Sequence, residues 1–468
     1  MRSSRWKALL SLLFAFALVA AACSGDEESG TAETDGEEVE ATETTEAAAE
    51  EEEPAEDEAM EDEAGDLSGT TVTVFGPESS DEEAGALQDA LDAFAAETGI
   101  DIQYTGARDF SDQINAQASG GNPPDIAIFP QPGKVADFAR EGFILPLPDD
   151  VAAASNANWP ADWNAFGVVD GTQYAVPNKA DLKSLVWYQP SRFEELGYEV
   201  PTTFDEFVAL VEQGVADGNT PLCVGIESGP ATGWTFTDWT EEMVLRFAGG
   251  DVYDQWVNHD IPFNDPQITD QMQAVIDLWN TPDAVFAAGG SIAATPFGDN
   301  GQPLVDGDCL MHRQASFFAA FIPEGTEFAT GNEGAVDVFY FPSNEGQPIL
   351  VAGTVAAAFN DRPEVWAVME YFSSAEYANV RQVAQTERKG GGVSGFLSAA
   401  NGTDASLYQG LEASFIEIIL NSDVARFDAS DLMPADVGAG TFWTEGTAAV
   451  NGDKSVAEAA DAIEASWP

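Results

Sequence analysis

The chain has 468 residues, with 82 acidic and 17 basic side chains and a formal net charge of −65. Hydrophobic residues make up 44% and aromatic residues 10%, which excludes a wholly disordered chain, and the length favours two lobes over one simple core. Because a protein this acidic is repelled by phosphate groups, nucleic acid is excluded as a partner. With three cysteines and two histidines, no metal site and no cofactor are expected.

The first 22 residues have the pattern of a signal peptide. Three positive side chains within the first seven residues precede an apolar run, Ala8 to Ala22, which is short for a membrane span. Small residues then lead to Cys23, and this junction resembles the lipobox of bacterial lipoproteins, with Ala20 where Leu is commoner. We expect a lipidated Cys23 that anchors the protein at the extracytoplasmic face of the cell membrane. The alternative is an ordinary secretory signal with an incidental cysteine.

Residues 23–66 are predicted to be the lipidated cysteine followed by a disordered acidic stalk. Residues 24–66 contain 21 acidic side chains and no Lys or Arg, so they bury too little surface to fold, and their charges repel one another. The interpretation is a spacer between membrane and body, and the alternative is a solubilising tail. The remaining 402 residues carry 61 acidic and 14 basic side chains, which indicates an acidic surface and not a particular site.

The start of the body alternates strand and helix patterns. Runs rich in β-branched and apolar residues predict strands over residues 71–75, 100–104 and 125–129. Between them, Ser80 and Glu83 suit a capping box that opens a helix, and a weaker helix pattern covers 110–119. This order predicts an α/β fold with parallel strands and helices on both faces of the sheet.

Polar residues follow two of these strands. Glu78 and Gln131 lie just beyond the carboxyl ends of the first and third strands. Ligands of such sheets bind beyond the carboxyl ends of the strands, so both residues are candidate ligand contacts.

Two later apolar segments are predicted to cross between lobes. Residues 174–188 hold two strand-like runs around a polar patch, and residues 349–359 form a return crossing. Asp181 and Lys183 lie in the polar patch, where they contact ligand or only hold the hinge. The first lobe is therefore expected to comprise residues 67–178 and about 349–396, and the second lobe about 179–348 and 397–468.

In residues 124–129 and 183–188 the chain resembles the family 1 extracellular solute-binding proteins of bacterial ABC importers. The resemblance spans roughly residues 70 to 468 and is closer to the subgroup that serves alpha-glucoside importers. The segments that carry it are residues 223–229, 231–239, 256–259, 295–299, 312–317, 431–434 and 437–443. The resemblance implies a two-lobed, type II periplasmic-binding-protein fold with a multi-strand hinge and a ligand cleft between mixed sheets. It also implies a permease and an ATPase as partners, and lipid anchoring through Cys23.

A sugar site needs aromatic platforms for ring faces and charged or amide groups for hydroxyls. Glu227, Trp234 and Asp238 gather near a Gly-rich turn and are the first candidates for the second-lobe wall. The alternatives are a core tryptophan and solvated acids, with Asp238 capping a helix over residues 240–247.

Further candidates lie later in the chain. Arg313 and Gln314 stand in an apolar stretch, where Arg313 either donates to ligand or pairs with an acid. Trp443 follows a Gly-rich loop and is expected to be exposed enough to stack on a sugar ring. Residues 390–392 are three glycines, but the Walker spacing is absent, which favours a turn over a phosphate loop.

Cys223 and Cys309 remain once Cys23 is lipidated. Outside the cytoplasm two such cysteines usually pair, so a disulfide within the second lobe is expected. The alternative is two buried thiols.

Three classes of function compete. The favoured one is a monomeric binding protein, not an enzyme, that captures an alpha-linked oligosaccharide for an ABC importer. The second is a secreted glycoside hydrolase with an acid pair among the residues Glu227, Asp238, Asp299 and Asp431. The third is a surface adhesin, which the non-repeating α/β body disfavours. His259 and His312 have no convincing catalytic partner in the sequence and are expected to be packing or surface residues.

Overall fold

The computed structural model describes residues 66–468. The predicted signal peptide (1–22), Cys23 and the stalk up to residue 65 lie outside the described residues. The described part of the chain forms one unit with two lobes, each built around its own sheet. Within residues 66–468 no helix combines the length and the hydrophobicity that crossing a bilayer requires.

A six-stranded mixed sheet organises the first lobe. β1 lies between β2 and β3 and runs parallel to both, which confirms the predicted parallel β-α-β-α-β order. The elements up to the first crossing are β1 (Thr71–Gly76), α1 (Glu83–Thr98), β2 (Asp101–Gly106), α2 (Phe110–Ser119), β3 (Ile126–Phe129), α3 (Pro132–Arg140), α4 (Asp149–Asn158), α5 (Ala161–Asn164), β4 (Val168–Val169), β5 (Thr172–Gln173) and β6 (Ala175–Leu182).

Alternate residues of these strands supply cores on opposite faces of the sheet. Ile126 and Ile128 of β3 pack with Leu87 and Leu91 of α1, whereas Phe129 packs with residues of α2 and α3. A fully apolar strand is needed where both faces are covered, which explains the run at residues 126–129.

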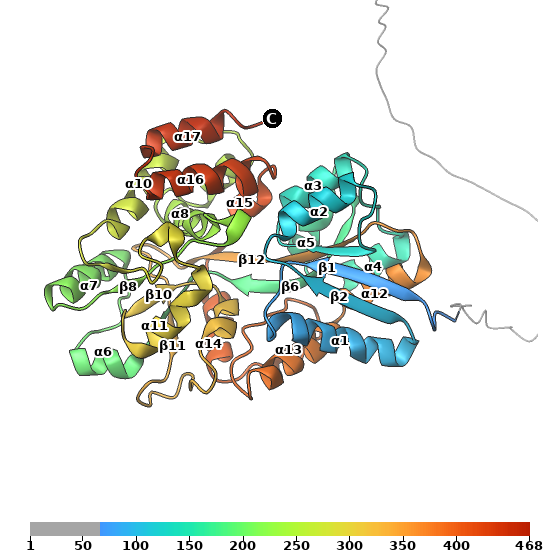
Figure 1. The fold of residues 1–468 in the computed structure, drawn as a ribbon, viewed down its shortest axis with the longest axis horizontal. Coiled ribbons are helices and arrows are strands. Elements are labelled where there is room, and N and C mark those ends of the chain that lie inside the picture. Colours follow the sequence, from blue (N-terminus) through green and yellow to red (C-terminus); the bar gives the residue numbers. More distant parts are fainter. Residues whose placement is uncertain (1–65) are drawn as a thin grey trace, which may run out of the picture. The chain divides into compact units, whose positions relative to one another are not determined.

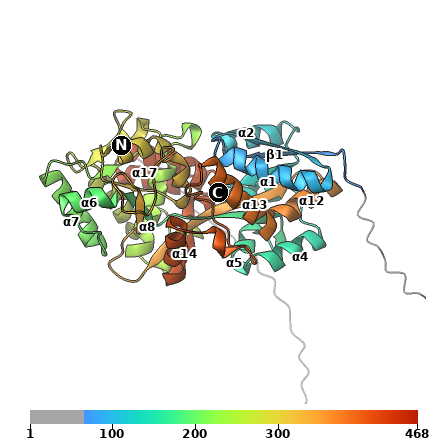
Figure 2. The ribbon, with the colours of Figure 1, turned by 90° about the horizontal axis from the view of Figure 1, so that it is seen from below.

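A five-stranded sheet in the order β11-β7-β10-β8-β9 organises the second lobe. Figures 1 and 2 both show α6, α7, α8 and α17 gathered here, apart from α1, α2, α12 and α13 of the first lobe. Its elements are β7 (Leu185–Tyr188), α6 (Pro190–Leu196), α7 (Phe204–Ala216), β8 (Leu222–Cys223), α8 (Trp234–Phe247), α9 (Gly250–Val257), α10 (Pro266–Trp279), β9 (Val285–Phe286), α11 (Gly301–Asp306), β10 (Met311–Arg313) and β11 (Asp337–Tyr340).

β6 and β12 run antiparallel along the middle of the molecule and connect the lobes (Figure 1). The two crossings predicted at residues 174–188 and 349–359 are thus strands, while the exact lobe boundaries stay predictions. The returning chain forms β12 (Pro348–Ala358), α12 (Pro363–Phe372), α13 (Ala375–Arg388), α14 (Leu411–Asn421), β13 (Val424–Phe427), α15 (Ala429–Leu432), a π-helical turn (Val437–Phe442), α16 (Trp443–Val450) and α17 (Val456–Glu464).

The prediction of a helix that starts near Thr240 with Asp238 as its cap is wrong. α8 begins at Trp234, after Gly233 with a φ of 115°, and Asp238 lies inside the helix. The early turns contain three threonines, which favour helix only weakly. Every residue from Thr235 to Arg246 is buried, so packing on all sides decides the helix here.

Candidate functional site

A cleft between the lobes is the candidate site. It is lined by first-lobe residues (Pro77, Glu78, Ser79, Ser80, Glu83, Arg108, Phe110, Ser111, Pro130 and Gln131), by residues of the crossing strands (Lys179, Asp181, Lys183, Ala352, Gly353 and Thr354), and by second-lobe residues (Ser228, Ala231, Trp234, Asp238, Phe297, Phe317, Phe321, Asp428, Ser430, Asp431 and Trp443). Seven of the ten predicted ligand residues are among them.

The first-lobe wall forms where parallel strands end. Glu78 follows β1, and Gln131 follows β3 and precedes α3. Both line the cleft, in the place that the strand pattern predicted for them. Their contact with a ligand remains a proposal.

A buried ionic group, here named the first charge cluster, consists of Glu78, Lys179, Asp181 and Arg381. The Lys179 ammonium donates to Glu78 Oε1 at 2.8 Å and lies 3.5 Å from Asp181 Oδ1. Arg381 of α13 pairs with the other Glu78 oxygen at 2.8 Å. Burial opposes the charge on Glu78, but Lys179 and Arg381 outweigh it and hold the Glu78 pKa below its usual range.

Sequence reasoning missed Lys179 and Arg381. Lys179, Asp181 and Lys183 lie two residues apart along and just after β6, and all three line the cleft. This period of two is the signal that could have identified Lys179. Arg381 has no such signal, because its partner Glu78 is some 300 residues away in the chain.

A second charge cluster lies deeper in the molecule. Its members are Lys183, Asp238, Glu242, Arg246, Arg313 and Asp428. The Lys183 ammonium bonds Asp238 at 2.7 Å and also pairs with Asp428, while Arg313 bridges Asp238 at 2.9 Å and Glu242 at 2.8 Å. Arg246 completes the chain of contacts by pairing with Glu242.

Burial and charge set the protonation of this second cluster. Burial raises the pKa of Asp238 to about 6, even though Lys183 and Arg313 oppose the shift. Asp428 is also buried, but Lys183 outweighs that burial and lowers the Asp428 pKa to about 2. Both carboxylates are therefore mostly ionised at neutral pH.

Three carboxyl groups, Asp238, Glu241 and Asp428, approach one another closely enough to hold a metal ion. However, the Lys183 ammonium already bonds both Asp238 and Asp428. Burial first, and then the charge of Asp428, raise the pKa of Glu241 well above its usual range. The ammonium already paired with two of the three carboxyl groups, and the raised pKa of the third, fit an ion-paired cluster better than a cation site.

Aromatic side chains form the second-lobe wall. The Trp234 ring packs 4.9 Å from Phe297 and 6.1 Å from Phe317 between ring centroids, and Phe321 packs 5.1 Å from Phe297. Phe297, Phe317 and Phe321 were not among the predicted contacts, although the first two stand in segments that carry the family resemblance. Trp443 also lines the cleft, but the expectation that it is exposed is wrong, because packing leaves it 4% exposed.

Three predicted ligand residues do not line the cleft. Glu227 accepts a hydrogen bond from the Gly229 backbone at 2.7 Å, so it stabilises the turn before α8. Arg313 is paired with two acids, which was the alternative to ligand contact. The Gln314 side chain folds back to accept from the Ala315 backbone at 2.9 Å. Their positions do not support a direct ligand role.

The hydrolase hypothesis required a suitable acid pair. Of its four candidates, only Asp238 and Asp431 line the cleft. Asp238 bonds Lys183 and Arg313, and burial followed by the charge of Asp428 raises the Asp431 pKa well above its usual range. Asp238 is therefore committed to two cations, while the surroundings of Asp431 shift it toward its neutral form.

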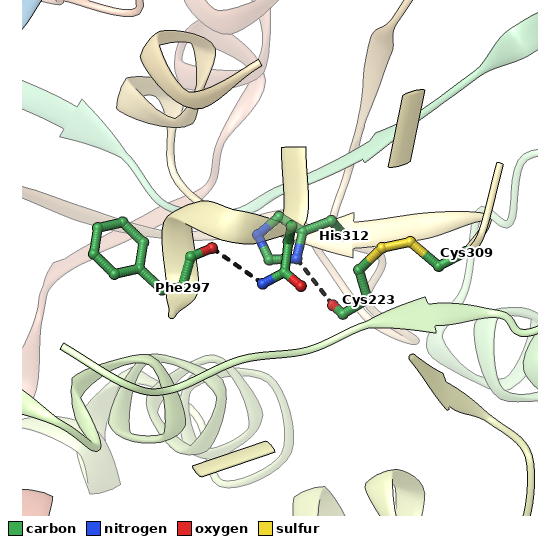
Figure 3. The surroundings of a disulfide bond; sticks show 5 residues. Cys223, Phe297, Cys309 and His312 are labelled. Atoms are coloured by element: carbon green, nitrogen blue, oxygen red, sulfur yellow. Dashed lines mark hydrogen bonds between the residues drawn. A yellow bond between two sulfur atoms is a disulfide. The ribbon is translucent and has the colours of Figure 1, made fainter. Parts of the chain in front are cut away.

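A disulfide joins Cys223 of β8 to Cys309, just before β10 (Figure 3). His312 donates a hydrogen bond from Nδ1 to the Cys223 carbonyl, 2.9 Å away, and packs on Phe318, while burial lowers its pKa to about 4. His259 stacks on Trp467 at 4.1 Å. The disulfide holds together the strands that lead to both sides of the aromatic wall, and both its ends lie in the second lobe.

Comparison with known proteins identifies the family to which the chain belongs. Residues 78–379 match the family of bacterial extracellular solute-binding proteins. The osmoprotective compounds-binding protein GgtB of Synechocystis sp. is 38% identical over 415 residues, which cover 86% of this chain and 94% of that protein. The alpha-glucosides-binding periplasmic protein AglE of Rhizobium meliloti is 37% identical over 426 residues, covering 86% and 88%.

Solved structures agree on the fold. The bacterial solute receptor AcbH, which has an exclusive preference for b-D-galactopyranose, superimposes with a TM-score of 0.71 at 19% identity, covering 85% of this chain and 98% of that one. The two-lobed, type II periplasmic-binding-protein fold expected from the sequence is thereby confirmed. The chain belongs to the bacterial extracellular solute-binding proteins, the sugar- or osmoprotectant-binding components of ABC importers.

Proposed function

We propose that the protein is a lipid-anchored binding protein that captures an alpha-glucoside in its interlobe cleft and delivers it to an ABC importer. The observation that carries this proposal is a cleft lined both by aromatic side chains of the second lobe and by ion-paired polar side chains. Sugars present apolar ring faces and polar edges, so a site with both kinds of lining suits them.

Trp234 and Phe317 line the cleft and are part-exposed, so they are able to pack on a sugar ring. Trp234 opens α8 at the cleft, and Phe317 follows β10 in the same wall. Glu78, Gln131 and Asp181 line the polar side, where oxygens and amides bond ring hydroxyls. Arg313 then acts as a positioning residue that holds Asp238 from behind the wall.

The names of two relatives support the proposed class of ligand. One close relative is named for alpha-glucosides and the other for osmoprotective compounds. The segments that resemble the alpha-glucoside subgroup include residues 231–239 and 295–299, and both contribute side chains to the aromatic wall. This agreement favours an alpha-linked glucoside over an unrelated solute.

Delivery requires two states. A ligand that contacts both lobes stabilises the closed form, because only there does it meet both walls. The closed, loaded form then presents the sugar to a permease and ATPase. Lipidation of Cys23 would keep the protein near that permease, with residues 24–66 as the spacer.

Isothermal titration calorimetry of the full chain against maltose, trehalose, sucrose and longer alpha-glucosides tests this function. We expect tight binding of at least one intact sugar. Trp234→Ala should weaken it at least about tenfold. Trp467→Ala removes a tryptophan that stacks on His259 outside the cleft and should leave binding unchanged.

Thin-layer chromatography of the same mixtures separates binding from hydrolysis. An intact sugar after overnight incubation agrees with a binding protein, whereas cleavage would establish the hydrolase alternative. No binding across the panel would reject the alpha-glucoside ligand.

A further inference from the structure

The charged residues at the cleft form clusters whose formal charges cancel. The first charge cluster contains two carboxylates, Glu78 and Asp181, and two cations, Lys179 and Arg381. The second contains three carboxylates and three cations in continuous contact. This balance contrasts with the rest of the body, where acids greatly outnumber bases.

Three further acids adjoin the clusters, and their surroundings raise the pKa of each one. Burial and the charge of Glu78 raise the pKa of Glu83 to about 7. Burial and the charge of Asp428 raise the pKa values of Glu241 and Asp431 well above their usual range. These shifts reduce the negative charge that the three acids add to the cleft walls.

Neither cleft lysine is available to an anionic ligand. Lys179 is held by Glu78 and Asp181, and Lys183 is held by two carboxylates of the second cluster. The remaining lining cation, Arg108, is exposed at the cleft and lies 6.0 Å from the Phe297 ring, where solvent screens its charge.

We propose that these balanced clusters make the cleft selective for uncharged sugars and exclude sugar acids of the same size, with Asp181 as the specificity-determining residue. This inference rests on the proposed function. An anion that enters the cleft loses its hydration, and both buried lining lysines are already paired, so only the exposed Arg108 is left to meet it and burial of the anion is unfavourable. Neutral hydroxyls pay a smaller desolvation cost and can share the existing carboxylates.

Asp181 is chosen because replacing it changes the charge of the first cluster and breaks the fewest contacts. Its Oδ1 makes no hydrogen bond among the described residues and contacts Lys179 only at 3.5 Å. Asp181→Asn keeps the shape but leaves Lys179 and Arg381 facing a single carboxylate, Glu78. Burial raises the pKa of Asp181, so at a pH where Asp181 is ionised the substitution makes this wall more positive by one charge.

The experiment compares matched ligands on the full chain. The alpha-glucoside that binds best among maltose, trehalose and sucrose is converted at one C6 to the carboxylate and, separately, to the neutral carboxamide. The two derivatives have nearly the same size, so their affinity ratio reports charge. For the wild type, calorimetry should show the carboxylate at least about tenfold weaker than the carboxamide.

Asp181→Asn should reduce that ratio by about tenfold or more, and added salt should restore part of it. Asp270→Asn is the control, because it changes net charge equally at an exposed position of α10. It should leave the ratio unchanged. If Asp181→Asn fails to fold, as judged by thermal melting, Glu78→Gln removes the other carboxylate of the same cluster and carries the same expectation.

Equal binding of carboxylate and carboxamide by the wild type would overturn the charge filter and leave the proposed function intact. An unchanged ratio in a folded Asp181→Asn protein that still binds the neutral sugar would overturn the role of Asp181. Failure of every neutral sugar to bind would instead reject the proposed alpha-glucoside function.

Discussion

The two charge clusters use the same chemistry at different depths. Lys179 in the first cluster and Lys183 in the second are each held between two carboxylates. The carboxylates beside Lys183 are 1–2% exposed, whereas those beside Lys179 are 8–10% exposed. A shallow ion pair can relax toward water when one member is lost, while a deep one leaves an uncompensated charge. The difference in exposure predicts that loss of a charged member costs more stability in the second cluster than in the first.

The strongest test of this comparison is Lys183→Met. It leaves Asp238 and Asp428 buried without their shared ammonium, so the free energy of unfolding should fall by about 3–5 kcal/mol. Urea unfolding followed by circular dichroism measures the loss. Lys454→Met breaks the pair with Glu445 at a part-exposed surface site and should cost less than about 1 kcal/mol. A similar cost for both variants would contradict the assigned depth.

Lys179→Met should have a smaller effect on stability, about 2 kcal/mol, because the shallow cluster can compensate. Arg381 still pairs with Glu78, and Asp181 can take up a proton at the cleft, since burial already raises its pKa. The same urea experiment measures it. If Lys179→Met destabilises as much as Lys183→Met, the distinction between the clusters fails.

Glu83 makes the neighbourhood of the first cluster sensitive to pH. Its pKa is about 7 in the folded protein against 4.5 as the ordinary value. Between those values the folded state keeps a proton that the unfolded state releases, so the free energy of unfolding falls as pH rises through this window and then levels off. Below pH 4.5 both states hold the proton and Glu83 contributes no slope.

Glu83→Gln should remove this pH dependence. The free energy of unfolding of the variant, relative to that of the wild type, should therefore rise by about 1–2 kcal/mol as pH increases from 4.5 to 8. Urea unfolding at several pH values measures the difference. Asp238 titrates in the same window and is present in both proteins, so the difference isolates Glu83. A constant difference across the range would show that Glu83 does not hold a raised pKa.

The smallest expected difference concerns the aromatic rings beside the two lysines. Lys183 lies 5.5 Å from the Trp234 ring and Lys179 lies 5.6 Å from the Phe317 ring. Tryptophan binds cations better than phenylalanine, so a double-mutant cycle of Trp234→Leu with Lys183→Met should give a coupling of about 1 kcal/mol. The cycle of Phe317→Leu with Lys179→Met should give about 0.5 kcal/mol. A reversed order would show that packing and not charge dominates these contacts.

Local patterns were enough to predict several parts of the protein. Residues 71–75 and 125–129 are short runs rich in β-branched or apolar residues and bounded by turn residues, and this pattern favoured strands. Glu78 and Gln131 follow such strands, and the rule that ligands bind at strand ends placed them at the cleft. The polar residues Asp181 and Lys183 were identified because they interrupt an apolar crossing.

Other features depended on packing between distant segments. α8 starts six residues before its predicted beginning, since burial on every side overrides the weak helix preference of its threonines. Trp443 follows a glycine-rich stretch that suggests exposure, but neighbouring elements cover it.

The sequence by itself determined the alternating α/β order, the two crossings and the family, because each is encoded in local periodicity or in ordered segments of the chain. Only the tertiary structure decided which charges pair. Arg381 reaches Glu78, and Arg313 joins Asp238 to Glu242, across separations that no local pattern records. Ion pairing depends on distances of a few ångströms between side chains, and those distances exist only after the lobes have packed.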